Sequence, residues 1–333
     1  MEKGTKLTLF GIGVGAGIAC GALLQRAMSK KLLCLAMSRE APKNLDKRKR
    51  LVSGSCEFLN VLDGMKAQSD KFEASGLENV EITSRDGLRL KGHFYENKNA
   101  KRVIVAMHGW RSSWCRDFCG IADFWHENGC SVLYAEQRGQ NGSEGEYIGF
   151  GISERYDCLE WARFISERTS GELPIYLAGV SMGATTVLMT SSLPLPESVC
   201  GIIADCGFTS PREIWRHVLR NNLKIPYGIV SRRIDASYKR ITEEKSNFSC
   251  EDALRRCKVP VLFVHGTADK FVPVEMTYKN YMACASEKTL MIVPGADHGM
   301  SYIKEKEKYE RTVLDFWEKN DERAGGLRGK EGE

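Results

Sequence analysis

Residues 174–183, Pro-Ile-Tyr-Leu-Ala-Gly-Val-Ser-Met-Gly, decide the fold of this chain. An apolar run of strand character ends in Gly-Val-Ser-Met-Gly, and the helix-forming residues Ala-Thr-Thr-Val-Leu-Met follow at once. A G-x-S-x-G between a strand and a helix predicts a nucleophile elbow, a sharp turn that exposes the serine side chain at the end of the strand. Glycine is expected on both sides, because a Cβ there would crowd the neighbouring strand and helix. Ser181 is therefore the candidate nucleophile.

Candidate catalytic partners of this serine follow three other predicted strands. An upstream apolar strand opens into the loop His108-Gly109-Trp110. Asp269 follows a strand downstream of the serine, and His298 follows the next strand. The order serine, aspartate, histidine along the chain is the one expected of an α/β-hydrolase.

Five landmarks occur in the same order as in that superfamily. They are the Asp-Gly-Leu-Arg-Leu hairpin (86–90), Glu-Gln-Arg-Gly (136–139), the elbow, Asp-Lys-Phe-Val-Pro (269–273) and Gly-Ala-Asp-His (295–298). On these motifs the chain resembles the α/β-hydrolase superfamily over roughly residues 78–319. Within it, the chain looks most like the compact serine-aminopeptidase-like and lysophospholipase-like esterases. The resemblance implies an α/β fold with a small helical lid.

The pattern of the elements agrees with that fold class. Strand-like and helix-like runs alternate from residue 102 to residue 318, which predicts a mostly parallel sheet with helices on both faces. The alternation is interrupted at about 207–258, the only candidate lid. Ser-Pro-Arg-Glu at 210–213 predicts the start of a lid helix with Trp215 on its apolar face. Its arginines, at positions 212, 216 and 220, either form a solvated basic face or bind an anionic group.

Each candidate catalytic residue has a distinct expected role. A neutral serine hydroxyl needs a base, and we expect His298 to take the proton of Ser181 during attack and return it to the leaving group. Asp269 is the expected partner that fixes the imidazole tautomer. Asp205, at the end of an earlier strand, is the rival for that role. Asp297 is expected to be a loop residue, since its side chain should point away from the neighbouring ring.

Two backbone N–H groups are expected to stabilise the oxyanion. The elbow supplies the N–H of Met182, and the loop after strand 102–107 supplies that of Trp110. The side chains of Trp110 and Trp215 are the expected substrate-pocket residues. His108 is expected to shape its loop by bonding to backbone groups.

These residues predict a serine hydrolase that cleaves carboxylic esters or thioesters through an acyl-serine intermediate. Its substrate would be a small-molecule or lipid-like acyl compound, and the reaction requires no metal or organic cofactor. A serine peptidase that releases N-terminal residues is the alternative, and it would need an acidic pocket for the substrate amine. A non-catalytic binding protein on the same fold is the other reading.

Composition limits the possible partners. The 333 residues carry a net charge of only +5, and no nucleic-acid-binding motif is present, so no nucleic-acid partner is expected. The twelve cysteines are scattered without zinc-ligand or disulfide-framework spacing, which predicts reduced thiols. The sequence makes no prediction about homo-oligomers.

The N-terminal region holds an uncharged, glycine-rich apolar stretch at 7–24. Residues 1–30 are interpreted as a membrane anchor, with a cleaved signal or a buried helix as alternatives. Basic residues after the stretch predict a single-pass membrane protein with a cytoplasmic catalytic domain, the alternative being an exported or cell-surface protein. Residues 31–77 are expected to form a helical stalk or linker and residues 320–333 a disordered tail.

Overall fold

The computed structural model describes residues 23, 25–40 and 57–326, and its centre is an eight-stranded sheet of order β1-β2-β4-β3-β5-β6-β7-β8. Strands β3 to β8 are parallel, and β1 and β2 form the antiparallel hairpin expected from the sequence. The chain therefore has an α/β-hydrolase fold. The strands span Glu78–Thr83 (β1), Arg89–Tyr95 (β2), Arg102–Met107 (β3), Cys130–Ala135 (β4), Ile175–Val180 (β5), Val199–Asp205 (β6), Val261–Gly266 (β7) and Lys288–Val293 (β8).

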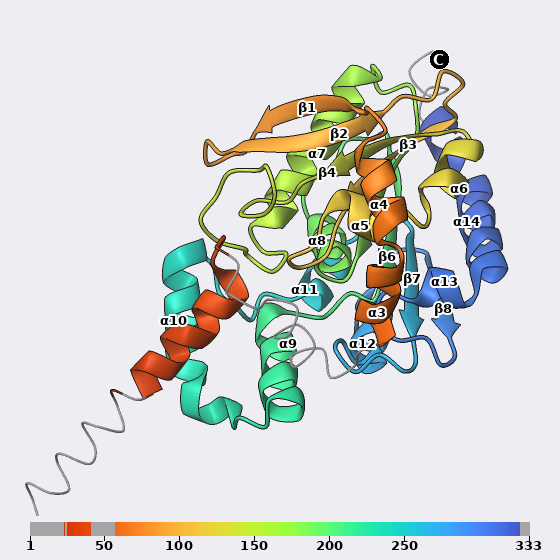
Figure 1. Cartoon of the computed structure of the whole chain (residues 1–333). Coiled ribbons are helices and arrows are strands. Elements are labelled where there is room, and N and C mark those ends of the chain that lie inside the picture. Colours follow the sequence, from red (N-terminus) through yellow and green to blue (C-terminus); the bar gives the residue numbers. More distant parts are fainter. Residues whose placement is uncertain (1–22, 24, 41–56, 327–333) are drawn as a thin grey trace, which may run out of the picture.

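Helices cover both faces of the sheet because successive strand residues point to opposite sides. In β5, Leu177 packs into one hydrophobic core and Tyr176 into the other, and both side chains are fully buried. Figure 1 shows α7 and α8 on one side of the sheet and α6 and α14 on the other. One face carries α7 (Glu154–Arg168), α8 (Met182–Thr190), α11 (Cys250–Leu254) and α12 (Val274–Ala283). The opposite face carries α5 (Trp114–Phe118), α6 (Ala122–Glu127), α13 (Ser301–Lys304) and α14 (Lys306–Gly326).

The lid consists of α9 (Pro211–His217), the π-helical turn η1 (Val218–Asn222) and α10 (Tyr227–Thr242). As the sequence indicates, α9 starts with a cap: Ser210 Oγ accepts a hydrogen bond from the N–H of Glu213 at 3.2 Å. Arg212 forms an ion pair with Asp235, and Arg216 forms one with Glu213, each at 2.9 Å. Of the three arginines predicted to share one face, at positions 212, 216 and 220, two are thus paired within the lid itself.

The described parts of the region expected to be a stalk, residues 31–40 and 57–77, lie against the hydrolase domain. Residues 25–37 form a helix, called here the N-terminal helix, which Figure 1 shows beside α10. Its Leu33 and Met37 belong to the main hydrophobic core. The next helices, α3 (Glu57–Gly64) and α4 (Lys66–Glu73), follow residues 41–56, and in α4 Phe72 packs edge-on against Trp114 of α5 with 4.9 Å between the ring centroids.

The membrane localisation predicted from the sequence is contradicted. Among the helices in the described part of the chain, none is long and apolar enough to cross a membrane. The stretch 7–24, on which the prediction rested, lies outside the described residues apart from Leu23. The part of the N-terminal region that is described packs on the catalytic domain because its leucines and methionines find apolar partners there.

The range predicted to be a disordered tail, 320–333, overlaps the end of helix α14. Helix α14 continues to Gly326, and Asn320 within it is almost fully buried. Asp321 fixes this last part of the helix, since its Oδ2 accepts a charged hydrogen bond from Arg102 Nη2 of β3 at 2.6 Å. Residues 327–333 lie outside the described residues.

Candidate active site

The turn between β5 and α8 has the geometry expected of a nucleophile elbow. Ser181 adopts φ 56° and ψ −116°, a strained conformation for a residue with a side chain. A Cβ on Gly179 would lie 2.3 Å from the carbonyl carbon of Gly183, and a Cβ on Gly183 would lie 1.8 Å from the backbone oxygen of Met107. Only glycine fits at these two positions, as the sequence predicts.

The structure brings Ser181, His298 and Asp269 together in a hydrogen-bonded chain. Ser181 Oγ lies 2.9 Å from His298 Nε2, and His298 Nδ1 lies 2.7 Å from Asp269 Oδ2. All three residues are buried, and they come from the elbow, the loop after β8 and the loop after β7. Since an ionised carboxylate only accepts, His298 Nδ1 is the donor, and Nε2 is left to accept the serine proton.

Charge complementarity stabilises the ionised forms of this pair. Burial by itself would raise the pKa of Asp269, but the charge of His298 and hydrogen bonds from His265 and His298 lower that pKa below its ordinary value. Burial likewise disfavours the imidazolium, yet the negative charge of Asp269 raises the pKa of His298 well above its ordinary value. The site therefore favours the positive charge that His298 would acquire as a general base.

Asp269 is also held by groups for which the sequence did not predict a contact with this carboxylate. Its Oδ1 accepts the N–H groups of Phe271 and Val272 at 2.9 and 2.8 Å. His265 Nε2 lies 3.1 Å from Asp269 Oδ2, and His265 Nδ1 lies 2.7 Å from Thr277 Oγ1. His265 is thus a positioning residue, although its His-Gly-Thr context gave no sign that its ring would reach the carboxylate.

The rival carboxylates make other contacts. Asp205 Oδ1 accepts a hydrogen bond from Ser301 Oγ at 3.0 Å, and burial raises the pKa of Asp205 to about 6. Asp297 Oδ1 accepts the backbone N–H of His298 at 2.8 Å, which makes it a loop-shaping group. Neither contact resembles the close pairing between Asp269 and the ring of His298.

The loop after β3 is fixed by hydrogen bonds to its backbone. His108 Nε2 accepts the N–H of Gln137 at 3.2 Å, so the ring proton is on Nδ1, which donates to the carbonyl of Gly109 at 2.8 Å. The N–H of Gly109 donates to Asp117 Oδ2 at 2.7 Å. Asp117 is another residue that the sequence analysis missed, because it lies in α5, eight positions away.

The two expected oxyanion donors remain available for a ligand. Within the described part of the chain, the backbone N–H groups of Trp110 and Met182 have no hydrogen-bond acceptor. Met182 opens α8, where the first N–H groups of a helix lack intrahelical partners. Such donors, fixed before the substrate arrives, are suited to stabilise a developing negative charge.

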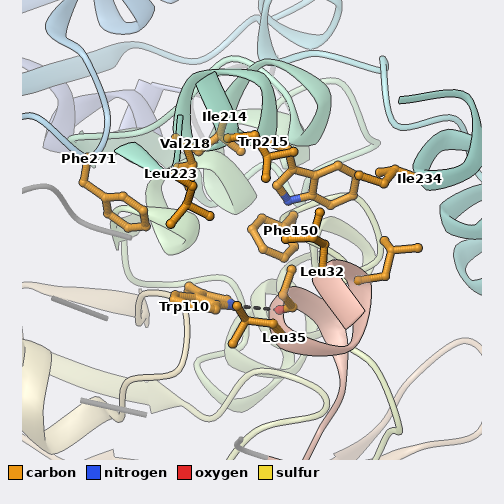
Figure 2. A pocket seen from close by; sticks show the side chains of 13 residues that line it. Leu32, Leu35, Trp110, Phe150, Ile214, Trp215, Val218, Leu223, Ile234 and Phe271 are labelled. Atoms are coloured by element: carbon orange, nitrogen blue, oxygen red, sulfur yellow. Dashed lines mark hydrogen bonds between the residues drawn. The ribbon is translucent and has the colours of Figure 1, made fainter. Parts of the chain in front are cut away.

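A pocket adjoins the site, and both predicted pocket residues, Trp110 and Trp215, line it. Phe271 also lines it and packs edge-on against His298, with 5.0 Å between the ring centroids. All of the pocket's thirteen described lining side chains are aliphatic or aromatic (Figure 2). The pocket therefore favours an uncharged, apolar ligand group.

One group of buried side chains in the described residues has the composition of a metal site. Ligand atoms of Cys206, Asp269 and His298 all lie within 4.8 Å of one another. Burial raises the pKa of the Cys206 thiol to about 11, which disfavours the thiolate that a metal would need. Metal binding would also break the hydrogen bond between Asp269 and His298, so this group fits the serine chemistry better than a metal.

Comparisons with known proteins agree with this fold. Residues 117–322 match the prolyl oligopeptidase family. The Bacillus subtilis protein YqkD is 26% identical over 71% of this chain and 77% of its own length. The Pyrococcus furiosus esterase Pf2001 has 21% identity and a TM-score of 0.61 over 75% of this chain and 95% of the esterase. The Pyrococcus horikoshii acylaminoacyl peptidase has 15% identity and a TM-score of 0.57 over 74% of this chain and 41% of the peptidase.

The family match spans more than half of the chain and includes the elbow, the loop after β7 and the loop after β8. The solved structures, all below a quarter identical, show that the fold is shared. The superfamily predicted from the sequence is confirmed. The chain belongs to the prolyl oligopeptidase family of the α/β-hydrolase superfamily and is a serine hydrolase of that class.

Proposed function

We propose that the protein hydrolyses carboxylic esters through an acyl-serine intermediate. The observation that carries this proposal is the continuous hydrogen-bonded chain from Ser181 Oγ through His298 to Asp269, with distances of 2.9 and 2.7 Å. Thioesters would react by the same route. The likeness of the fold to the Pyrococcus furiosus esterase supports a small-molecule substrate.

The reaction follows from the positions of these groups. Ser181 Oγ attacks the ester carbonyl carbon while His298 Nε2 takes its proton, and Asp269 stabilises the imidazolium that forms. The carbonyl oxygen becomes an oxyanion that accepts hydrogen bonds from the N–H groups of Trp110 and Met182. His298 then protonates the departing alkoxide. Water, activated by His298, attacks the acyl-serine in the same manner and releases the acid.

A peptidase that releases N-terminal residues is the second candidate, because the family match and the acylaminoacyl peptidase likeness favour it. Such an enzyme needs an acidic group near the substrate amine. The pocket beside Trp110 offers none among its described lining residues. Burying a protonated amine there without a partner would be costly, so the ester reading is favoured.

The test uses the full-length chain and two serine variants. Ser181→Ala removes the nucleophile, and we expect hydrolysis of p-nitrophenyl butyrate to fall about 10⁴-fold or more, together with loss of labelling by a fluorophosphonate probe. Ser192→Ala, near the end of α8, removes only a hydroxyl that donates to the Met189 carbonyl at 3.2 Å and is the matched control. A folded Ser181→Ala protein that keeps most of its activity refutes the proposal, as does a wild-type protein that neither labels nor hydrolyses esters.

A further inference from the structure

The apolar pocket has two walls that come from distant parts of the sequence. The lid supplies one wall, where Ile214 and Trp215 are 3% and 7% exposed. The N-terminal helix supplies the other with Leu32 and Leu35, as Figure 2 shows. The helix is therefore a part of the pocket.

The N-terminal helix has one apolar and one polar side. Leu33 and Met37 are buried in the main core, whereas Lys30, Lys31 and Cys34 are exposed. Because residues three and four apart share a helix face, this pattern fixes which side faces the domain. The side chains that it turns toward the pocket carry no charge.

The C-terminal end of this helix is bonded to the loop that carries a proposed oxyanion donor. The last carbonyls of a helix have no intrahelical partners. Here the carbonyl of Ala36 accepts a hydrogen bond from Trp110 Nε1 at 2.8 Å, drawn as a dashed line in Figure 2. The carbonyl of Leu35 accepts one from Arg111 Nη2 at 3.2 Å, which also places a positive charge at the negative end of the helix dipole. Helix and loop thus hold each other in place.

Aromatic side chains connect this pocket to the reacting groups. The rings of Trp110 and Phe271 both line the pocket, with 6.5 Å between their centroids. Phe271 also contacts the ring of His298. A substrate carbonyl bound by the N–H of Trp110 would therefore carry its acyl chain at the entrance to the pocket.

We infer that the N-terminal helix completes an acyl-binding pocket and selects esters of neutral, hydrophobic acyl groups longer than acetyl. This inference rests on the proposed ester hydrolysis and names its substrate class. Each methylene moved from water into the pocket contributes about 0.8 kcal/mol, which corresponds to a factor of about four. A charged acyl group would find no polar or charged partner among the described residues of the pocket and would lose its hydration.

The catalytic experiment compares p-nitrophenyl octanoate with p-nitrophenyl acetate. For the wild-type protein we expect kcat/KM to be at least tenfold higher for the octanoate. Leu35→Gln puts a polar amide into the wall and should lower this ratio about tenfold, since a small change in a hydrophobic pocket alters discrimination by that order. Lys31→Gln, on the exposed side of the same helix, should leave the ratio unchanged. If Leu35→Gln does not unfold cooperatively, Leu32→Gln tests the same wall.

A binding experiment separates this inference from the proposed reaction. The Ser181→Ala protein is titrated with methyl octanoate, and binding is followed by tryptophan fluorescence because Trp110 and Trp215 line the pocket. We expect saturable binding that Leu35→Gln weakens about tenfold.

Ester hydrolysis with an octanoate-to-acetate ratio near one, unchanged in Leu35→Gln, overturns the inference and leaves the proposed reaction standing. Methyl octanoate binding that depends on Leu35, in a protein whose wild type hydrolyses no ester, overturns the reaction and supports the pocket. The absence of methyl octanoate binding overturns the inference whatever the esterase result.

Discussion

Replacing Asp269 by asparagine tests the role of this carboxylate most directly, because its surroundings dictate how the amide must sit. The backbone N–H groups of Phe271 and Val272 donate to Oδ1, so this position must keep an acceptor. The amide oxygen therefore stays there, and the NH₂ group takes the place of Oδ2. It then faces His298 Nδ1, which is 2.7 Å from Oδ2 in the wild type.

The consequence is the wrong tautomer of His298. Nδ1 must accept the amide hydrogen, so Nε2 carries the proton and can no longer take one from Ser181. Loss of the correct tautomer in a serine triad costs about 10⁴-fold in kcat, or about 5.5 kcal/mol of activation free energy. By contrast, Asp205→Asn can still accept the hydrogen bond from Ser301 through its amide oxygen. We expect it to lose less than tenfold, about 1 kcal/mol.

The assay is kcat/KM for p-nitrophenyl butyrate as a function of pH. Wild-type activity should fall as the pH drops through the pKa of His298, since only the neutral imidazole is a base. Because Asp269 raises this pKa, the fall should begin above the usual histidine range, and the residual activity of Asp269→Asn should fall at a lower pH. An Asp205→Asn protein that is the weaker enzyme, or an Asp269→Asn protein that keeps a tenth of the activity, refutes this assignment.

Two further substitutions test the fold around the site. Gly183→Ala would place a Cβ 1.8 Å from a backbone oxygen of β3, so we expect no cooperative thermal unfolding, whereas Gly228→Ala, with open space at its Cβ, should unfold normally. In the wild type, the carboxylate of Asp157 lies 2.5 Å from Arg138 Nε, and its side chain is only 2% exposed. Arg138→Met would leave this carboxylate buried without its partner. Urea unfolding should show a loss of about 3–5 kcal/mol. For Arg163→Met, whose ion pair with Glu160 is partly exposed (43% and 28% of the two side chains), we expect a loss of less than about 1 kcal/mol; equal losses would contradict this prediction.

The sequence alone predicted the class of fold and the position of the proposed nucleophile. Both depend on local patterns: an apolar strand, a turn that only glycine permits and a helix place Ser181 without reference to the rest of the chain. Strand ends also located Asp269 and His298, because the carboxyl ends of parallel strands lie at one edge of the sheet. The proposed oxyanion donors are the backbone N–H groups of Met182 and Trp110. They follow from the elbow and from the loop after β3.

The tertiary structure decided which groups meet across those strand ends. Asp205 ends β6 and Asp269 follows β7, and only the packing of the loop after β7 turns Asp269 toward His298. The roles of His265 and Asp117 depend on side-chain reach between elements, which periodicity does not encode. Such contacts are absent from any single window of sequence.

The N-terminal region shows the same limit most clearly. Its sequence predicted a membrane anchor at 1–30 and a helical stalk or linker at 31–77, yet the helix at 25–37 packs between the lid and the loop that carries Trp110. An apolar helix face is satisfied equally by lipid, by a partner or by its own domain, so the pattern alone cannot choose among them. In this structure, hydrogen bonds from the loop after β3 to the carbonyls of Leu35 and Ala36 hold the helix on its own domain. These bonds join groups more than seventy residues apart in the chain, so the local pattern does not reveal them.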